Sequence, residues 1–136
     1  MQKPVVKDMF FLRQKSEECT KDDLNDVKNL VDTFLANRER CVGMAANMIG
    51  VRKRFIVVEF MNRPLVMINP EIISKSGRYE TEEGCLSLSG MRKTVRFRNI
   101  TVAYQDMQFA KHTQAFTGYT AQIIQHEIDH CDGIVI

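Results

Sequence analysis

The residues with the clearest chemical potential are His126, Glu127 and His130, which form an H-E-x-x-H pattern. Two residues four apart lie on the same face of a helix, so both imidazoles can bind one metal ion. Glu127 stands beside them and can take a proton from a water whose pKa the metal lowers. The pattern uses two of the three histidines in the sequence, and it predicts a catalytic metal site.

A catalytic site of this kind has three protein ligands and an open position for water. No histidine or glutamate follows at the spacing of the common metallopeptidases, so the third ligand is expected upstream. Cys85 is the first candidate, because Gly84 permits close approach of the backbone and the neighbouring residues are not typical of a core. Cys41 is the second candidate, and Cys19 lies in a charged segment. Cys131 directly follows the second histidine and is expected to point away from the metal.

The segments that must position these residues show helical and strand periodicity. Apolar residues at helical spacing predict an amphipathic helix over residues 21–37, with Thr20 and Asp23 as a capping pair. β-Branched and aromatic residues then predict a hairpin of two strands at 55–60 and 65–68.

Further strands are predicted by short apolar runs between turn residues. Asn69-Pro70 indicates a turn, and a short strand at 72–76 is expected to end at Gly77. Residues 79–93 have the composition of a loop. Strands are predicted at 95–97, 100–104 and 109–116, with a turn at 106–108 before the last.

The final predicted element is a helix over residues 117–129, with Thr117 as its cap. The order of elements predicts an α+β fold: antiparallel β-sheets packed around a C-terminal helix that carries H-E-x-x-H, with an N-terminal amphipathic helix.

Composition narrows the class of protein. The 136 residues and 44% hydrophobic content predict a single domain over residues 1–136. No apolar run of membrane-spanning length and no secretory signal is evident, so a cytoplasmic protein is expected. The net charge of +2 gives no argument for nucleic acid. Four cysteines in such a chain favour metal binding or chemistry over disulfides.

With these residues in hand, the chain resembles the peptide deformylases. That family carries three motifs in order: G-x-G-x-A-A-x-Q, E-G-C-L-S and H-E-x-D-H. Residues 83–87 and 126–130 match the second and third motifs completely. Residues 41–48 match the first in part, since Cys41 replaces its first glycine and Met48 its glutamine.

The resemblance implies a hydrolase that removes the formyl group from N-formylmethionine of nascent polypeptides. It implies Cys85, His126 and His130 as ligands of one divalent ion, Fe(II) physiologically, with zinc, nickel or cobalt as substitutes. Glu127 would be general base and then acid. The backbone N–H of Leu86 would donate to the oxyanion.

Four residues are implied to bind the substrate. Gly43 would pair with the peptide backbone, and Val42 would border the methionine pocket. Ile123 would line the same pocket or belong to the ordinary core. Arg92 would lie near the substrate or on a solvated strand edge.

In the family, the glutamine that ends the first motif donates a side-chain N–H to the formyl oxyanion. Met48 is therefore the main departure, because a thioether has no hydrogen to donate. Loss of one such donor costs about 10²–10³ in rate. One interpretation is a deformylase of reduced efficiency. A second is that the adjacent Asn47 supplies the amide, which would need a local distortion. A third is a degenerate paralogue that binds metal with lost or altered activity.

Two other classes compete with this interpretation. A metallopeptidase would need a third His or Glu ligand, and the spare histidine, His112, is expected to be solvated. A metal-stabilised binding protein would need a closed site of four ligands, with Cys41 or Cys131 added. Transient contact with the ribosome is plausible for a deformylase, although the small net charge gives it little support.

Overall fold

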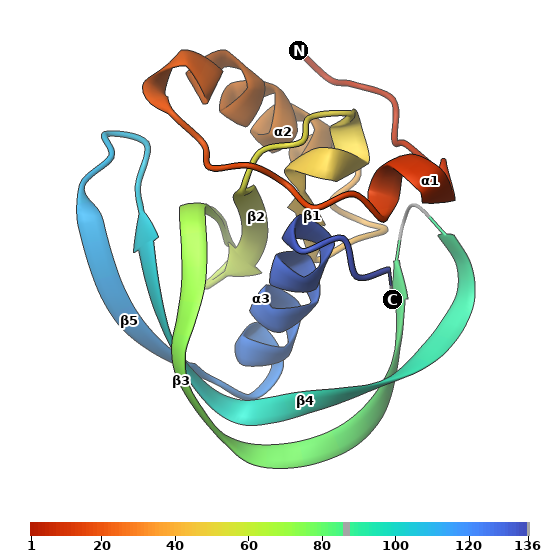
Figure 1. Cartoon of the computed structure of the whole chain (residues 1–136), viewed down its shortest axis with the longest axis vertical. Helices are drawn as coiled ribbons and strands as arrows, with labels where there is room; N and C mark the ends of the chain where they lie inside the picture. Colours follow the sequence, from red (N-terminus) through yellow and green to blue (C-terminus); the bar gives the residue numbers. More distant parts are fainter. Residues whose placement is uncertain (86–87, 136) are drawn as a thin grey trace.

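The computed structural model describes residues 1–85 and 88–135. A central helix is wrapped by a bent antiparallel sheet, and a second helix covers the other side (Figure 1). This is the α+β architecture expected from the sequence. In chain order the elements are α1 (Met9–Leu12), η1 (Lys21–Asp23), α2 (Leu24–Ala36), β1 (Gly43–Ala45), η2 (Ala46–Ile49), β2 (Phe55–Phe60), β3 (Arg63–Cys85), β4 (Leu88–Gln105), β5 (Lys111–Thr117) and α3 (Gly118–Cys131).

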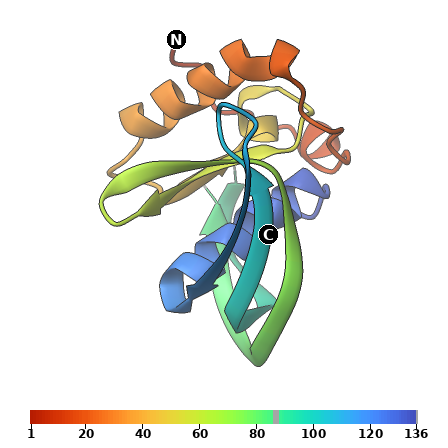
Figure 2. The ribbon, with the colours of Figure 1, turned by 90° about the vertical axis from the view of Figure 1, so that its left-hand side faces the viewer.

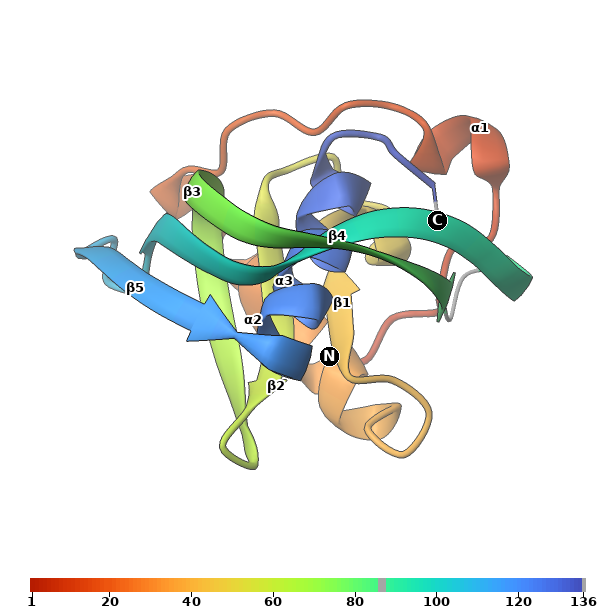
Figure 3. The same cartoon turned by 90° about the horizontal axis from the view of Figure 1, so that it is seen from below.

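The five strands of the described residues form one sheet in the order β1-β2-β3-β4-β5, with every neighbouring pair antiparallel. Met61 and Asn62 join β2 to β3, and both have positive φ, as a tight two-residue hairpin requires. β3 and β4 are long and curved: they bend around α3 in Figure 1 and pass across it when the molecule is seen from below (Figure 3).

The sheet is buried on both faces where β2 crosses the molecule. Ile56 and Val58 pack toward α3, whereas Phe55 and Val57 pack toward α2. α2 therefore lies on one side of the sheet and α3 on the other (Figure 2). Burial on both faces explains why this strand is a continuous apolar run without alternation.

The two predicted helices are present near their expected bounds. The Thr20 N–H donates to the Asp23 carboxylate over 2.8 Å, as the predicted capping pair requires. Helix α3 begins after Thr117 and continues to Cys131, two residues beyond the expected end. Short elements α1, β1 and η2 were not predicted, because three or four residues carry little periodicity.

Two predictions about β3 were wrong. Asn69-Pro70 is not a turn but an irregularity within β3, where Asn69 has a φ of 51° and the register shifts. Its side chain accepts from the Cys19 N–H at 2.8 Å and donates to the Cys19 carbonyl at 3.0 Å, which ties the bulge to the N-terminal segment. Gly77 does not end the strand, since pairing continues on both sides of it.

The expected loop over residues 79–93 is also a strand region. Tyr79 pairs with Arg96 and Glu83 with Arg92, so the described part of this segment forms the ends of β3 and β4. The segment is polar because most of its residues on β3 are exposed or half-buried, and not because it forms a loop. The turn at 106–108 was predicted correctly: the Asp106 carboxylate accepts from the N–H groups of Gln108 and Ala110 at 2.9 and 3.0 Å.

No helix in the described part of the chain is long and apolar enough to cross a membrane.

Candidate metal centre

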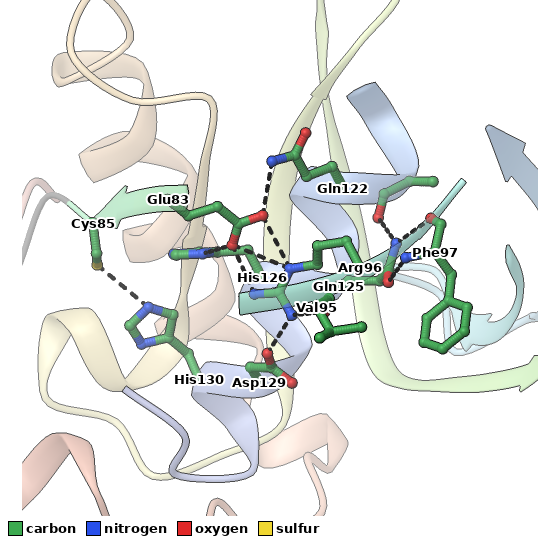
Figure 4. Close-up of polar contacts among 11 residues, drawn as sticks. Glu83, Cys85, Val95, Arg96, Phe97, Gln122, Gln125, His126, Asp129 and His130 are labelled. Carbon is green, nitrogen blue, oxygen red and sulfur yellow. Dashed lines mark hydrogen bonds and ion pairs between the residues drawn. The ribbon is translucent and has the colours of Figure 1, made fainter. Parts of the chain in front are cut away.

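Three of the predicted ligands converge although they are far apart in sequence. Cys85 ends β3, and His126 and His130 lie one turn apart on α3. One ligand atom from each lies within 4.8 Å of the others. The Cys85 Sγ is 3.3 Å from the His130 Nε2, and Figure 4 shows the sulfur pointing at that ring. Two atoms bound to one tetrahedral ion would be about 3.5 Å apart, so this donor set fits a single small cation.

The orientation of His126 is set by Glu83. Its Nδ1 lies 2.8 Å from the Glu83 Oε1, so Nε2 is the ring nitrogen that remains for a metal. His130 is fully buried, and burial lowers its pKa to about 3. Its ring is therefore neutral, which is the state in which an imidazole binds metal.

Glu83 is the centre of a buried polar network (Figure 4). Besides His126, it receives hydrogen bonds from Arg96 at 2.7 Å and from the Gln122 amide at 2.8 Å. Burial alone would raise the pKa of Glu83, but the donated hydrogen bonds outweigh it and hold the pKa at about 2. The Arg96 guanidinium, only 3% exposed, also contacts the Asp129 carboxylate at 2.7 Å.

This network was not predicted as part of the site. Glu83 and Asp129 belong to the two complete motifs, and that was the one signal available in the sequence. The position of Arg96 depends on the pairing of β3 with β4, in a region where a loop was expected.

Glu127 lies beside the three candidate ligands and is only 4% exposed. Its Oε1 has no hydrogen-bond partner among the described residues. Burial raises the pKa of Glu127 to about 7, with the positive charge of His126 acting in the opposite direction. A buried carboxyl of this kind can exchange a proton with a reacting group in the adjacent cleft.

The absence of a side chain at Gly43, on β1, leaves room for the side chain of Glu127. A Cβ added at position 43 would lie 2.9 Å from the Ile123 Cγ2 and 3.0 Å from the Glu127 Oε2. Both distances are below an ordinary van der Waals contact, so a side chain here would displace one of these groups.

Two of the candidate ligands, Cys85 and His126, line a cleft of about 680 Å³. Val42, Gly43 and Ile123, which the resemblance predicts to contact substrate, line this cleft, and so does Glu127. Arg92 is not among the described residues that line it, so its expected position near the substrate is not supported. Leu86, the expected backbone donor, lies outside the described residues.

Met48 lines the cleft, whereas Asn47 does not. The Met48 Sδ is buried and lies 3.4 Å from the Ala45 N–H. The Asn47 amide donates instead to the His130 carbonyl at 2.9 Å. The idea that Asn47 replaces the missing donor is therefore wrong, because its amide is committed to the His130 carbonyl and Asn47 is not among the described residues that line the cleft.

The remaining metal-ligand candidates lie outside the three-residue group. Cys41 lines the cleft, while Cys19 and Cys131 are buried in the hydrophobic cores. No disulfide joins any of the cysteines in the described part of the chain. His112 is exposed and pairs with Asp106 at 2.7 Å, in keeping with the expected solvated histidine.

Comparison with known proteins gives a consistent result over nearly the whole chain. A family model described as polypeptide deformylase matches residues 3–136. The peptide deformylase of Clostridium beijerinckii is 57% identical over 136 residues, which is all of both chains. That of Desulforudis audaxviator is 45% identical over 130 residues, covering 91% of this chain and 83% of its own.

Solved structures agree with the sequence comparison. The crystal structure of the Thermotoga maritima peptide deformylase has a TM-score of 0.89 and 29% identity, covering 99% of this chain and 95% of that one. A class I type b peptide deformylase from Acinetobacter baumannii, with Met-Ala-Ser bound, has a TM-score of 0.88 and 30% identity, covering 99% and 97%.

Proposed function

The chain belongs to the polypeptide deformylase family, and from this premise we propose how its own residues carry out the reaction. It is an enzyme that removes N-formyl groups from nascent peptides by hydrolysing the formyl amide bond. One observation carries the proposed site: Cys85, His126 and His130 converge beside the buried carboxyl of Glu127.

The family is metal-dependent, and we propose Cys85, His126 and His130 as the ligands of one divalent ion. A thiolate and two imidazoles with mutually close donor atoms support this assignment. We propose Fe(II) as the physiological metal, with zinc, nickel or cobalt able to replace it, because this donor set suits each of them. When bound, the ion supplies Lewis-acid polarisation of the formyl carbonyl and a water of lowered pKa.

Glu127 is the proposed general base and acid. It takes the proton of the attacking water and returns it to the nitrogen of the leaving methionine amine. The unpaired Oε1 and the nearly complete burial of the side chain support this role. The backbone N–H of Leu86 is proposed to donate to the oxygen of the tetrahedral intermediate.

The substrate peptide is proposed to lie along β1. This strand is at the edge of the sheet, and an extended peptide can pair with an edge strand through its backbone. Gly43 would provide that pairing, while Val42 and Ile123 would border the methionine side chain. The related Acinetobacter baumannii enzyme binds Met-Ala-Ser, which supports a short methionyl peptide as the ligand of this cleft.

The activity is tested by loading the protein with Fe(II) or Ni(II) and measuring formate release from formyl-Met-Ala-Ser. Acetyl-Met-Ala-Ser is the matched control, because it differs only in the acyl group. We expect formate release from the first peptide and no acetate release from the second. A metal-loaded protein without activity would favour the degenerate paralogue instead.

Met48 bears on the efficiency of the enzyme. Its Sδ is directed at the Ala45 N–H and cannot donate to an oxyanion. We expect Met48→Gln to raise kcat by about tenfold or more, because an amide donor stabilises the transition state. An unchanged rate would show that the missing amide does not limit catalysis.

The enzyme is proposed to act in the cytoplasm, where nascent formylated chains are made, with transient ribosome contact. The net charge of +2 gives little electrostatic support to that contact, so it is expected to be weak.

A further inference from the structure

Hydrolysis of an amide places negative charge on the carbonyl oxygen, and a catalyst gains rate from each donor directed at that oxygen. Two sulfur-containing side chains from the loop and helical turn around β1 line the same cleft as Glu127: Cys41 and Met48. Met48 has no donor hydrogen. Cys41 carries a thiol, which is a weak donor when it is protonated.

Several other polar side chains of the cleft already have partners, while Tyr119 on α3 is largely exposed to solvent. The Gln122 amide donates to Glu83 at 2.8 Å. The guanidinium of Arg40 donates to Asn37, and that of Arg38 pairs with Glu59. Among the described residues lining the cleft, the thiol of Cys41 is therefore the best-placed uncommitted donor on the β1 side.

The surroundings of Cys41 keep it protonated and link it to the reacting centre. Burial and the Glu127 carboxylate together raise the pKa of this thiol to about 11, against the opposing effects of the Gly43 N–H and of Arg40. An ordinary thiol is also mostly protonated at neutral pH. Cys41, Gly43 and Glu127 all line the cleft, and the Glu127 carboxylate is close enough to act electrostatically on the Cys41 thiol.

A second observation indicates that a group binds beside Glu127 in the cleft. Glu127 is almost completely buried, yet its Oε1 has no partner among the described residues. A buried carboxylate oxygen without a partner costs free energy unless a bound group satisfies it. A bound group, the attacking water or the reacting end of the substrate, is therefore expected beside Glu127, in the cleft that Cys41 and Gly43 also line.

We propose that the Cys41 S–H donates a hydrogen bond to the formyl oxygen as negative charge develops there. It would be a side-chain donor in addition to the proposed backbone N–H of Leu86. This inference rests on the proposed deformylase activity. It assigns a catalytic role to one of the two residues by which this chain departs from the family's first motif.

The proposal is tested by comparing Cys41→Ala with Cys41→Ser in reduced, metal-loaded enzyme acting on formyl-Met-Ala-Ser. The two replacements have similar size, but only serine can donate. We expect Cys41→Ala to lower kcat by about tenfold, less than loss of an amide donor because S–H is weak. Cys41→Ser should stay within about threefold of wild type, with KM unchanged in both variants.

A double-mutant cycle with Met48→Gln separates this role from a structural one. With a glutamine amide present, we expect Cys41→Ala to cost less than about twofold, because the oxyanion already has a side-chain donor. Cys19→Ala is the matched control, a buried cysteine outside the cleft whose loss should leave kcat unchanged.

Three results would overturn the proposal. Cys41→Ala could match wild type, or alanine and serine could be equally impaired, or the cost of Cys41→Ala could be the same with and without Met48→Gln. Failure of the proposed function is distinguishable: metal-loaded wild type would itself release no formate. In that case both proposals fall, whereas active wild type with an unaffected Cys41→Ala overturns this one alone.

Discussion

The Glu83 carboxylate accepts a 2.8 Å hydrogen bond from the Nδ1 of His126, which is 43 residues later in the chain. Glu83, which lies two residues before the candidate ligand Cys85, thus orients the candidate ligand His126. β3 and α3 are joined at the site by this contact as well as by the metal they are proposed to share. A change to Glu83, like a change to His126, is therefore expected to affect metal binding.

Glu83→Gln should weaken metal binding while the protein stays folded. The amide keeps the shape of the side chain but loses the negative charge that faces His126 and Arg96. We expect metal affinity to fall by about 10–100-fold, as is typical when a partner of a ligating histidine is changed. Competition with a fluorescent chelator measures this, and the exposed Glu80→Gln is the control. Equal affinities for the two variants would contradict the role of Glu83.

Arg96→Met should destabilise the fold. The guanidinium is almost fully buried between Glu83 and Asp129, and its removal leaves two partly or fully buried carboxylates without their cation. We expect a loss of about 3–5 kcal/mol in the free energy of unfolding. Urea denaturation measures it. Arg98→Met is the control on the same strand, where the exposed guanidinium stacks on Tyr79 and should be worth about 1 kcal/mol or less.

The elements predicted correctly from the sequence are those whose apolar pattern is contained within the element itself. Helices α2 and α3 and strand β2 each have enough regular apolar residues to be identified alone, and α3 carries its chemistry at a fixed helical spacing. Residues 79–93, which include Tyr79, Glu80 and Glu82, were interpreted as a loop from their composition. Their strand structure comes from backbone pairing across the β3–β4 hairpin, which no local pattern reports.

The same limit applies to the site. His126, His130 and Glu127 were identified because H-E-x-x-H spacing brings metal-binding residue types together, and Cys85 from its neighbours and the family resemblance. The bond of Arg96 to Glu83 depends on strand register and on how α3 lies in the curved sheet. The position of the Asn47 amide depends on packing of η2 against the end of α3.

Gly43→Ala should reduce activity through a steric effect. The new Cβ would lie within about 3 Å of both Ile123 and Glu127, so one of them must move. A displacement of about 1 Å at a catalytic group can cost 10²-fold in rate. We expect kcat/KM for formyl-Met-Ala-Ser to fall by about this amount while metal affinity is retained. Activity within twofold of wild type would contradict the close fit of Gly43 against Glu127.

Glu127→Gln should separate catalysis from metal binding. The amide fills the same space but cannot accept a proton from the attacking water, so kcat should fall by about 10²–10⁴-fold. Metal affinity should remain within a fewfold of wild type, because Glu127 is not among the three converging ligands. Formate release and chelator competition on the same preparation check both parts. A variant that loses metal and activity together would indicate a ligand role instead.

The central claim is that Cys85, His126 and His130 hold one metal ion and leave a coordination position open. X-ray absorption spectroscopy of the cobalt- or zinc-loaded protein tests it most directly. We predict one sulfur at about 2.3 Å, two imidazole nitrogens at about 2.0–2.1 Å, and a light-atom ligand that a hydroxamate displaces. Cys85→Ser should remove the sulfur shell. A shell with two sulfurs, a shell with none, or four protein ligands that resist displacement would contradict the account.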